Sequence, residues 1–124
     1  MMKEKKITLL VAEDEEYNMM YLLELFSSTN IHVLEASNGQ VAIEIVQKHN
    51  EIDLVLMDIK MPVLNGYEAM NAIKKLRPNI PIIALSAFAM KSEKQAAINE
   101  GFDSYITKPI NKKLLFEKIK EFTS

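Results

Sequence analysis

Residues 54–58 of the chain read Leu54-Val55-Leu56-Met57-Asp58, four apolar residues that end in an acid. A continuous apolar run of this kind predicts a strand that is buried on both faces, as in a parallel sheet covered by helices on each side. Similar runs occur near the start of the chain and around residue 84. The predicted strands are Ile7–Ala12, His32–Ala36, Leu54–Met57, Ile82–Ser86 and Ser104–Thr107.

Segments with a helical spacing of apolar residues lie between these strands. The predicted helices contain Met19–Phe26, Ala42–His49 and Ala69–Ile73, and two more are expected at Lys91–Glu100 and Lys112–Phe122. Asn18 is expected to open the first helix, Asn38, Asn65 and Asn111 to cap later ones, and Gly101 to end the fourth. Five such strand–helix units predict an α/β fold with a doubly wound parallel sheet, whose functional site lies at the carboxyl ends of the strands.

The composition excludes several classes of function. The chain has 124 residues, which predicts one domain over 1–124, and the absence of cysteine excludes disulfides and thiolate metal sites. A net charge of −2 offers nucleic acid no general attraction. The basic residues 1–6 precede six apolar residues, too few for a signal peptide or for the roughly 20 residues that span a bilayer. We therefore expect a soluble cytoplasmic protein that binds neither a membrane nor nucleic acid directly.

Polar residues follow the predicted strands where their carboxyl ends meet. Glu13 and Asp14 follow the first strand, Asp58 the third, Ser86 ends the fourth, and Lys108 follows the fifth. Three carboxylates at one edge repel each other, and a hard divalent cation such as Mg²⁺ is the common way to neutralise them. Because Mg²⁺ often completes its coordination with phosphate oxygens, the pattern favours a carboxylate that attacks phosphorus and forms an acyl phosphate.

This arrangement resembles the receiver domain of two-component response regulators, and the resemblance covers essentially the whole chain. The residues that carry it are Glu13-Asp14, Met57-Asp58-Ile59-Lys60-Met61-Pro62, Gly66, Ser86-Ala87 and Lys108-Pro109. The resemblance implies a flavodoxin-like fold with five helices and the strand order 2-1-3-4-5.

The resemblance also implies roles for the acidic residues. Asp58 is expected to be the phosphoacceptor, taking a phosphoryl group from the phosphohistidine of a histidine kinase or a histidine phosphotransfer protein. Glu13, Asp14 and Asp58 are expected to bind Mg²⁺ together with the backbone carbonyl of Lys60. Such a chain would catalyse only its own phosphorylation and dephosphorylation, and would not act as an enzyme on another substrate.

The remaining site residues are expected to sense the phosphoryl group. Lys108 would contact it, held by a cis bond to Pro109, and Ser86 would hydrogen-bond one of its oxygens. Tyr105 matches the aromatic switch residue, which turns inward as the serine moves. The surface of the fourth helix, fifth strand and fifth helix would then change for a separate, unidentified downstream protein.

Glu13 and Ser86 are mild departures from the common pattern of the family, and two other positions depart from it more strongly. Lys60 lies two residues after Asp58, and Phe88 lies two residues after Ser86. Both positions border the path of the water that hydrolyses the acyl phosphate, so this pair predicts a phosphoryl group that lasts for minutes or longer.

Three further segments resemble receivers of hybrid histidine kinases, namely Glu13–Asn18, Met61–Glu68 and Ser86–Met90. Such receivers dock a helical bundle that carries the phosphohistidine. The expected apolar contacts are Met19, Met20, Tyr21 and Pro109-Ile110.

Two other functions stay open at this stage. A phosphatase with an aspartyl-phosphate intermediate, similar to haloacid dehalogenases, would need a second acid where this chain has Lys60. A receiver-like interaction domain that is never phosphorylated would keep the fold without the chemistry. A nucleotide-binding module is disfavoured, because the three glycines of the chain are scattered and form no phosphate loop.

Overall fold

The computed structural model describes residues 6–124, so the basic residues 1–5 that enter the signal-peptide argument lie outside the described residues. Five parallel strands form one sheet in the order β2-β1-β3-β4-β5, which confirms the predicted topology. The strands are β1 (Ile7–Ala12), β2 (Ile31–Ala36), β3 (Leu54–Asp58), β4 (Ile82–Ser86) and β5 (Ser104–Thr107). The helices are α1 (Glu16–Phe26), α2 (Gly39–Lys48), α3 (Gly66–Leu76), α4 (Lys91–Glu100) and α5 (Lys112–Thr123).

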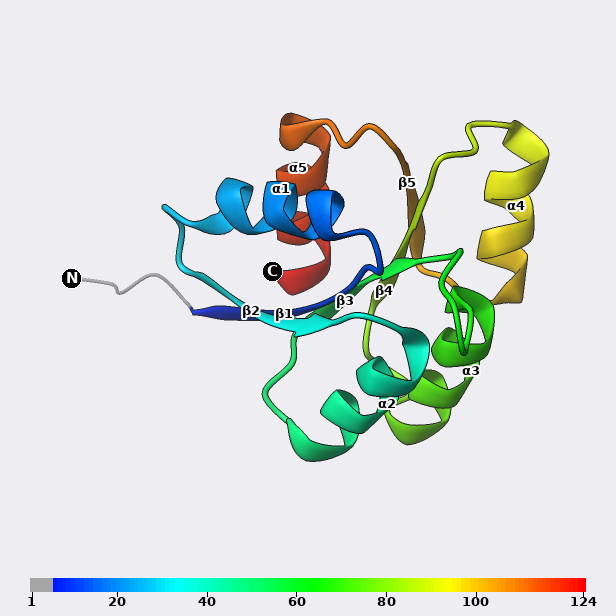
Figure 1. The fold of residues 1–124 in the computed structure, drawn as a ribbon, viewed down its shortest axis with the longest axis horizontal. Helices are drawn as coiled ribbons and strands as arrows, with labels where there is room; N and C mark the ends of the chain where they lie inside the picture. The colour runs from blue at the N-terminus through cyan, green and yellow to red at the C-terminus, as the bar shows by residue number, and fades with distance from the viewer. Residues whose placement is uncertain (1–5) are drawn as a thin grey trace.

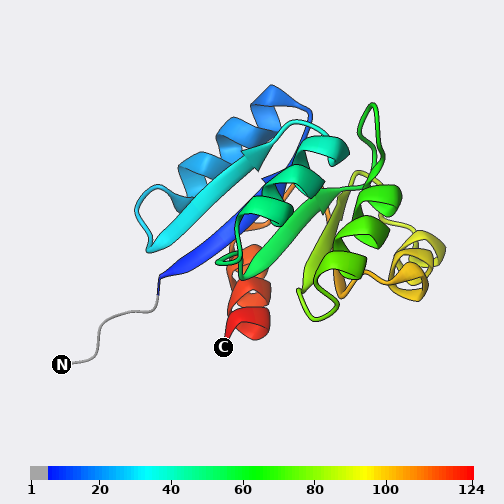
Figure 2. The same ribbon diagram turned by 90° about the horizontal axis from the view of Figure 1, so that it is seen from below.

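The helices cover both faces of the sheet. Figure 1 shows α1 and α5 on one face and α2 and α3 on the other, with α4 beside α3 near β5. Figure 2, seen from below, shows α2 and α3 in front of the sheet, with their axes roughly along the strands. Alternate residues of β3 enter two separate cores, Leu56 beneath α1 and α5, and Met57 beneath α2 and α3. A strand with both faces covered must be apolar throughout, which explains the continuous runs in the sequence.

Most predicted helix ends are confirmed by side-chain hydrogen bonds. Asn38, Asn65 and Asn111 each accept a hydrogen bond from a backbone N–H of the following helix. Gly101 ends α4 with a φ of 131°, a conformation that glycine adopts without steric cost. The expectation for Asn18 was wrong, because α1 already begins at Glu16.

The strand register determines what meets at the carboxyl edge. Ala12 of β1 lies opposite Met57, Asp58 of β3 opposite Leu85, and Ser86 of β4 opposite Thr107. The residues at or just after these strand ends therefore share one edge of the sheet. Within residues 6–124, no helix combines the length and the apolar character needed to cross a bilayer.

Candidate functional site

A lysine and two buried carboxylates form the centre of the site at this edge. The Nζ of Lys108 lies 2.8 Å from Oε1 of Glu13 and 2.9 Å from Oδ2 of Asp58. Lys108 is positioned from its own backbone, because its N–H donates to the carbonyl of Ser86 at 2.7 Å. The expected cis bond between Lys108 and Pro109 is present. The structure thus brings together the ends of β1, β3, β4 and β5.

The third predicted acid, Asp14, completes a cluster of carboxylates. Glu13, Asp14 and Asp58 each offer an oxygen within 4.8 Å of the others, with Asp14 exposed and the other two buried. Oε2 of Glu13 accepts a hydrogen bond from the N–H of Glu15 at 3.1 Å. Oε1 of Glu13 is buried and, apart from its ion pair with Lys108, has no hydrogen-bond partner among residues 6–124. A buried carboxylate oxygen with spare coordination capacity, beside two more acids, fits a hard divalent cation.

The pKa values of Glu13 and Lys108 are both shifted by their surroundings. Burial, followed by the contact with Asp58, raises the pKa of Glu13 to about 7. Burial alone would lower the pKa of Lys108, but its contacts with Glu13 and Asp58 outweigh that effect and raise it above the ordinary value. The lysine therefore stays charged, while the pocket carries more negative charge than one ammonium can neutralise.

The loop between β3 and α3 holds Asp58 in place through its backbone. The N–H of Lys60 donates to Oδ1 of Asp58 at 3.0 Å, and the N–H of Gly66 donates to the carbonyl of Ile59 at 2.8 Å. A Cβ at Gly66 would lie only 2.4 Å from the carbonyl oxygen of Asp58, so the close approach requires glycine. Val63 in the same loop has a φ of 68°, a strained conformation for a β-branched residue that the sequence did not reveal.

The two predicted sensing residues meet at the backbone of Phe88. Oγ of Ser86 accepts a hydrogen bond from the N–H of Phe88 at 3.1 Å, and the hydroxyl of Tyr105 donates to its carbonyl at 2.7 Å. Tyr105 is only 8% exposed, so its side chain already points inward. The Nζ of Lys60 lies 4.0 Å from the centre of the Phe88 ring. The two departures from the family pattern are thus in direct contact, a pairing that sequence reasoning missed.

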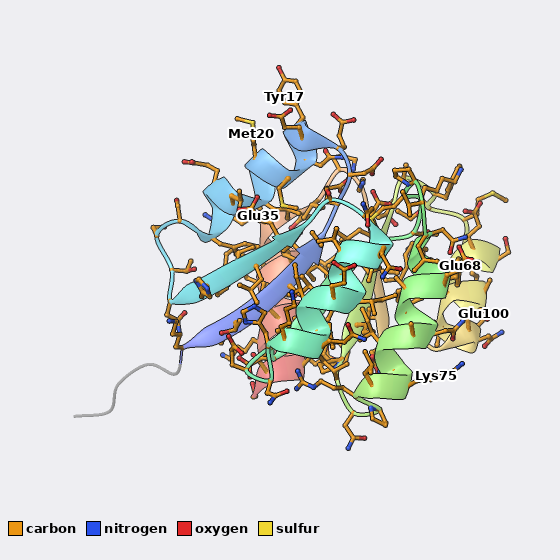
Figure 3. All side chains as sticks on the ribbon, turned by 60° about the horizontal axis from the view of Figure 1, so that its bottom comes forward. Tyr17, Met20, Glu35, Glu68, Lys75 and Glu100 are labelled. Carbon is orange, nitrogen blue, oxygen red and sulfur yellow. The ribbon has the colours of Figure 1, made fainter. Side chains whose placement is uncertain are left out.

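The predicted docking residues divide into exposed and buried ones. Met20 is 60% exposed, as is Tyr17 at 81%, a residue outside the expected set, and both project outward from α1 in Figure 3. Tyr21 is also exposed, and its hydroxyl donates to the carbonyl of Ile110 at 3.2 Å, which joins α1 to the loop after β5. The expectation that Met19 and Ile110 form surface contacts was wrong, because both are buried in the core under α1 and α5. Their apolar side chains pack against the sheet.

The fold and the site define a class of protein, a doubly wound α/β domain with an acidic pocket at the carboxyl edge of its sheet. The model of the response regulator receiver domain matches residues 9–120, and the chain belongs to this family. Its function is therefore that of a signal-transduction domain of two-component systems, with an acidic pocket formed by Glu13, Asp14 and Asp58.

Curated relatives of this family differ greatly in length. The chain is 34% identical over 118 residues to the polar-differentiation response regulator DivK of Brucella anthropi, covering 93% of this chain and 94% of that protein. It is 42% identical over 118 residues to hybrid signal transduction histidine kinase I of Dictyostelium discoideum, covering 89% of this chain but only 7% of the kinase. The chain thus spans nearly the whole of one relative and a small part of the other.

Two solved structures show the same fold with bound components. The receiver domain of sensor histidine kinase PA1611 from Pseudomonas aeruginosa PAO1, with a magnesium ion coordinated in its active site cleft, has a TM-score of 0.87 at 26% identity, covering 96% of this chain and 98% of that one. A co-crystal structure of the Saccharomyces cerevisiae histidine phosphotransfer protein Ypd1 with the receiver domain of Ssk1 has a TM-score of 0.88 at 31% identity. The match covers 95% of this chain and 89% of that one.

Proposed function

We propose that this chain is a phosphorylation-dependent switch of a two-component phosphorelay, in which Asp58 accepts a phosphoryl group from a phosphohistidine. The observation that carries the proposal is the pairing of Asp58 with Lys108 at 2.9 Å inside a cluster of three carboxylates. A lysine ion pair alone would be a structural element, and acids alone would be a surface patch. Together they provide a nucleophile, a cation for the transferred group and ligands for a metal ion.

We infer that Mg²⁺ is the metal ion at this site. Glu13, Asp14 and Asp58 would hold it, with the backbone carbonyl of Lys60 as a further ligand. The buried Oε1 of Glu13, whose one partner among the described residues is Lys108, supports this assignment, as does the Mg²⁺ in the PA1611 receiver domain. When bound, the ion would neutralise negative charge on the phosphoryl oxygens during transfer.

The transfer itself is a displacement at phosphorus. A carboxylate oxygen of Asp58 forms the new P–O bond while the P–N bond to the donor imidazole breaks, and the bonding electrons stay on the imidazole nitrogen. Lys108, already 2.9 Å from Oδ2, balances charge on the phosphoryl oxygens. The chain is both catalyst and substrate in this step, so it is not an enzyme for a separate substrate.

Ser86 and Tyr105 would convert the new charge into a change of surface. The hydroxyl of Ser86 accepts a hydrogen bond from the N–H of Phe88 and keeps its own proton free to donate to a phosphoryl oxygen. Because Tyr105 donates to the carbonyl of the same Phe88, a shift of Ser86 reaches Tyr105 through one residue. The changed face would comprise α4, β5 and α5.

The phosphodonor would dock over α1. The exposed Tyr17, Met20 and Tyr21 lie on the helix that follows Glu13 and Asp14, and large exposed apolar side chains mark interaction surfaces. A histidine kinase or histidine phosphotransfer protein is the expected partner, as in the complex of Ypd1 with the Ssk1 receiver. The downstream partner would be a separate protein or a neighbouring domain.

An NMR experiment on the whole chain tests the switch. Acetyl phosphate with Mg²⁺ should shift the amide signals of Ser86, Phe88 and Tyr105, and Mg²⁺ alone should leave Tyr105 unchanged. Asp58→Asn, which keeps the shape and removes the acceptor, should show no response to acetyl phosphate. The absence of any acetyl phosphate response in the unsubstituted chain would overturn the proposed function.

A further inference from the structure

A second cavity of about 390 Å³ lies beside the phosphoacceptor pocket, between the starts of α3 and α4. Ser86 forms part of its wall, and the aromatic rings of Tyr67, Phe88 and Tyr105 line much of the rest. Glu93, in the first turn of α4, is the one acidic residue of the lining among the described residues. A cavity with three aromatic walls and an acid has the composition of a site for a cationic group.

The electrostatic surroundings of this cavity favour positive charge. The pKa of Tyr67 is raised, first by burial and then by the neighbouring Tyr105, Glu100 and Glu93. Figure 3 shows Glu100 on α4, a helix that also carries Lys91 and Lys94, so the negative charge at the cavity comes from Glu93 of its lining. Lys60 is the one basic residue of the lining among the described residues.

Lys60 already shows how a cation uses the cavity. Its ammonium lies 4.0 Å from the centre of the Phe88 ring, within the range in which the negative face of an aromatic ring attracts a cation. Lys60 is exposed and makes no ion pair within residues 6–124, so its side chain can leave the ring at small cost. An incoming cation would take over the ring and gain the carboxylate of Glu93 as well.

We propose that the cavity between α3 and α4 binds an arginine or lysine side chain from a basic segment of a partner protein, which displaces Lys60 from Phe88. The use of this cavity by a downstream protein rests on the proposed function, whereas the binding of a cation does not. The guanidinium of arginine fits best, because it can stack on an aromatic face and pair with a carboxylate at the same time.

A titration with N-acetyl-arginine amide tests this proposal without knowledge of the partner. The neutral isostere N-acetyl-citrulline amide is the control probe, and both are followed by the ring signals of Tyr67, Phe88 and Tyr105 in the metal-free, unphosphorylated chain. We expect arginine to bind about fivefold more tightly than citrulline, the ratio that a partly exposed ion pair with Glu93 provides. Equal affinities for the two probes would overturn the proposal.

Variants of the chain locate the binding and separate it from phosphotransfer. Glu93→Gln should lose most of the preference for arginine, while Glu121→Gln on the exposed side of α5 should keep it. Lys60→Met, which removes the resident ammonium, should tighten arginine binding. Asp58→Asn should bind arginine like the unsubstituted chain, even if Asp58 proves not to be a phosphoacceptor. Loss of binding in Asp58→Asn would place the arginine in the acidic pocket and contradict the proposal.

Discussion

The two ends of the sheet each pair a lysine with an aspartate, but they use the pair differently. At the amino end, the Nζ of Lys74 lies 2.7 Å from Oδ2 of Asp103 and also donates to the carbonyl of Ile80. The same Asp103 oxygen accepts from the N–H of Ile82 at 2.8 Å. One lysine balances one acid, and their hydrogen bonds hold the start of β4 in place.

At the carboxyl end, one ammonium faces three carboxylates. Lys108 contacts Glu13 and Asp58, and Asp14 lies within 4.8 Å of both acids. Negative charge is left over, and the buried Oε1 of Glu13 has no partner besides Lys108 among the described residues. The comparison teaches that a balanced pair stabilises the fold, whereas an unbalanced cluster at a strand edge is prepared for a ligand that supplies the missing charge.

Substitution of Asp14 should produce the largest difference between the two ends. Asp14→Asn removes one exposed carboxylate from the cluster and should weaken Mg²⁺ binding at least about 10–100-fold. That range is typical when a residue that only hydrogen-bonds a metal ligand is substituted, and loss of a ligand itself should cost no less. Calorimetric titration with Mg²⁺ measures the loss. Asp103→Asn at the amino end is the matched control and should leave Mg²⁺ affinity unchanged. Equal affinity in Asp14→Asn and the unsubstituted chain would remove Asp14 from the site.

For the free energy of unfolding, we expect the larger effect at the amino end of the sheet instead. Asp103→Ala leaves the N–H of Ile82 without its acceptor and the ammonium of Lys74 without its carboxylate, so we expect a loss of about 2 kcal/mol in the free energy of unfolding. Urea denaturation measures this loss. Asp14→Ala, which removes an exposed side chain, should change stability by less than about 0.5 kcal/mol. Similar losses in both variants would show that the two ends are not distinct.

The pH dependence of stability should reveal the buried acid of the unbalanced end. The pKa of Glu13 is about 7 in the folded chain, above its ordinary value of 4.5, so the folded state holds the proton more tightly than the unfolded state. The stabilisation that comes from the protonated form of Glu13 is complete below pH 4.5 and is lost as the pH rises through 7. Above pH 7 the ionised carboxyl costs folding free energy on the order of 1–3 kcal/mol.

Glu13→Gln removes that cost. Without Mg²⁺, it should therefore stabilise the chain at pH 8 and have little effect near pH 4, as measured by urea denaturation at both values. Glu51→Gln, at an exposed position near the amino end, is the control and should show no gain at pH 8. A Glu13→Gln variant that is less stable than the parent at pH 8 would contradict the expectation that burial of the ionised Glu13 carboxylate costs folding free energy.

The smallest expected effect concerns the contact between Lys60 and Phe88. We expect the phosphoryl group on Asp58 to last for minutes or longer, because neither an apolar ring nor an ammonium can act as a base to orient the attacking water. Phe88→Glu supplies a carboxylate and should speed hydrolysis about tenfold, less than the roughly 10²–10⁴-fold of a fully positioned general base. Decay after acetyl phosphate removal measures the rate, with Met90→Glu as the control. Loss of the group within seconds in the unsubstituted chain would contradict the expectation.

Much of this architecture could be predicted because it depends on patterns that the backbone enforces. The apolar run before Asp58 predicted a buried central strand, and parallel pairing then required strand ends to share one edge. Loop side chains could not be predicted in the same way. The contact between Lys60 and Phe88 depends on rotamers in two separate loops, and the inward position of Tyr105 depends on a hydrogen bond to a backbone carbonyl.

The face of α1 shows that helical spacing can be more reliable than a list of apolar residues. Met19 shares its spacing with Leu22 and Phe26, whereas Met20 lies four residues from both Glu16 and Glu24. The structure buries Met19 and exposes Met20, because only one side of a helix can face the sheet. The spacing therefore distinguished the two methionines, and the expectation that Met19 contacts a partner disregarded it.

Intact-mass measurement after incubation with acetyl phosphate and Mg²⁺ tests the central claim, that the unbalanced acids make Asp58 a phosphoacceptor. The unsubstituted chain should gain the mass of one phosphoryl group and lose that gain after treatment with hydroxylamine, which cleaves acyl phosphates. Asp58→Asn should gain nothing, whereas Asp103→Asn at the balanced end should be labelled like the parent. An unsubstituted chain without the added mass, or an Asp58→Asn variant that still acquires it, would contradict the account.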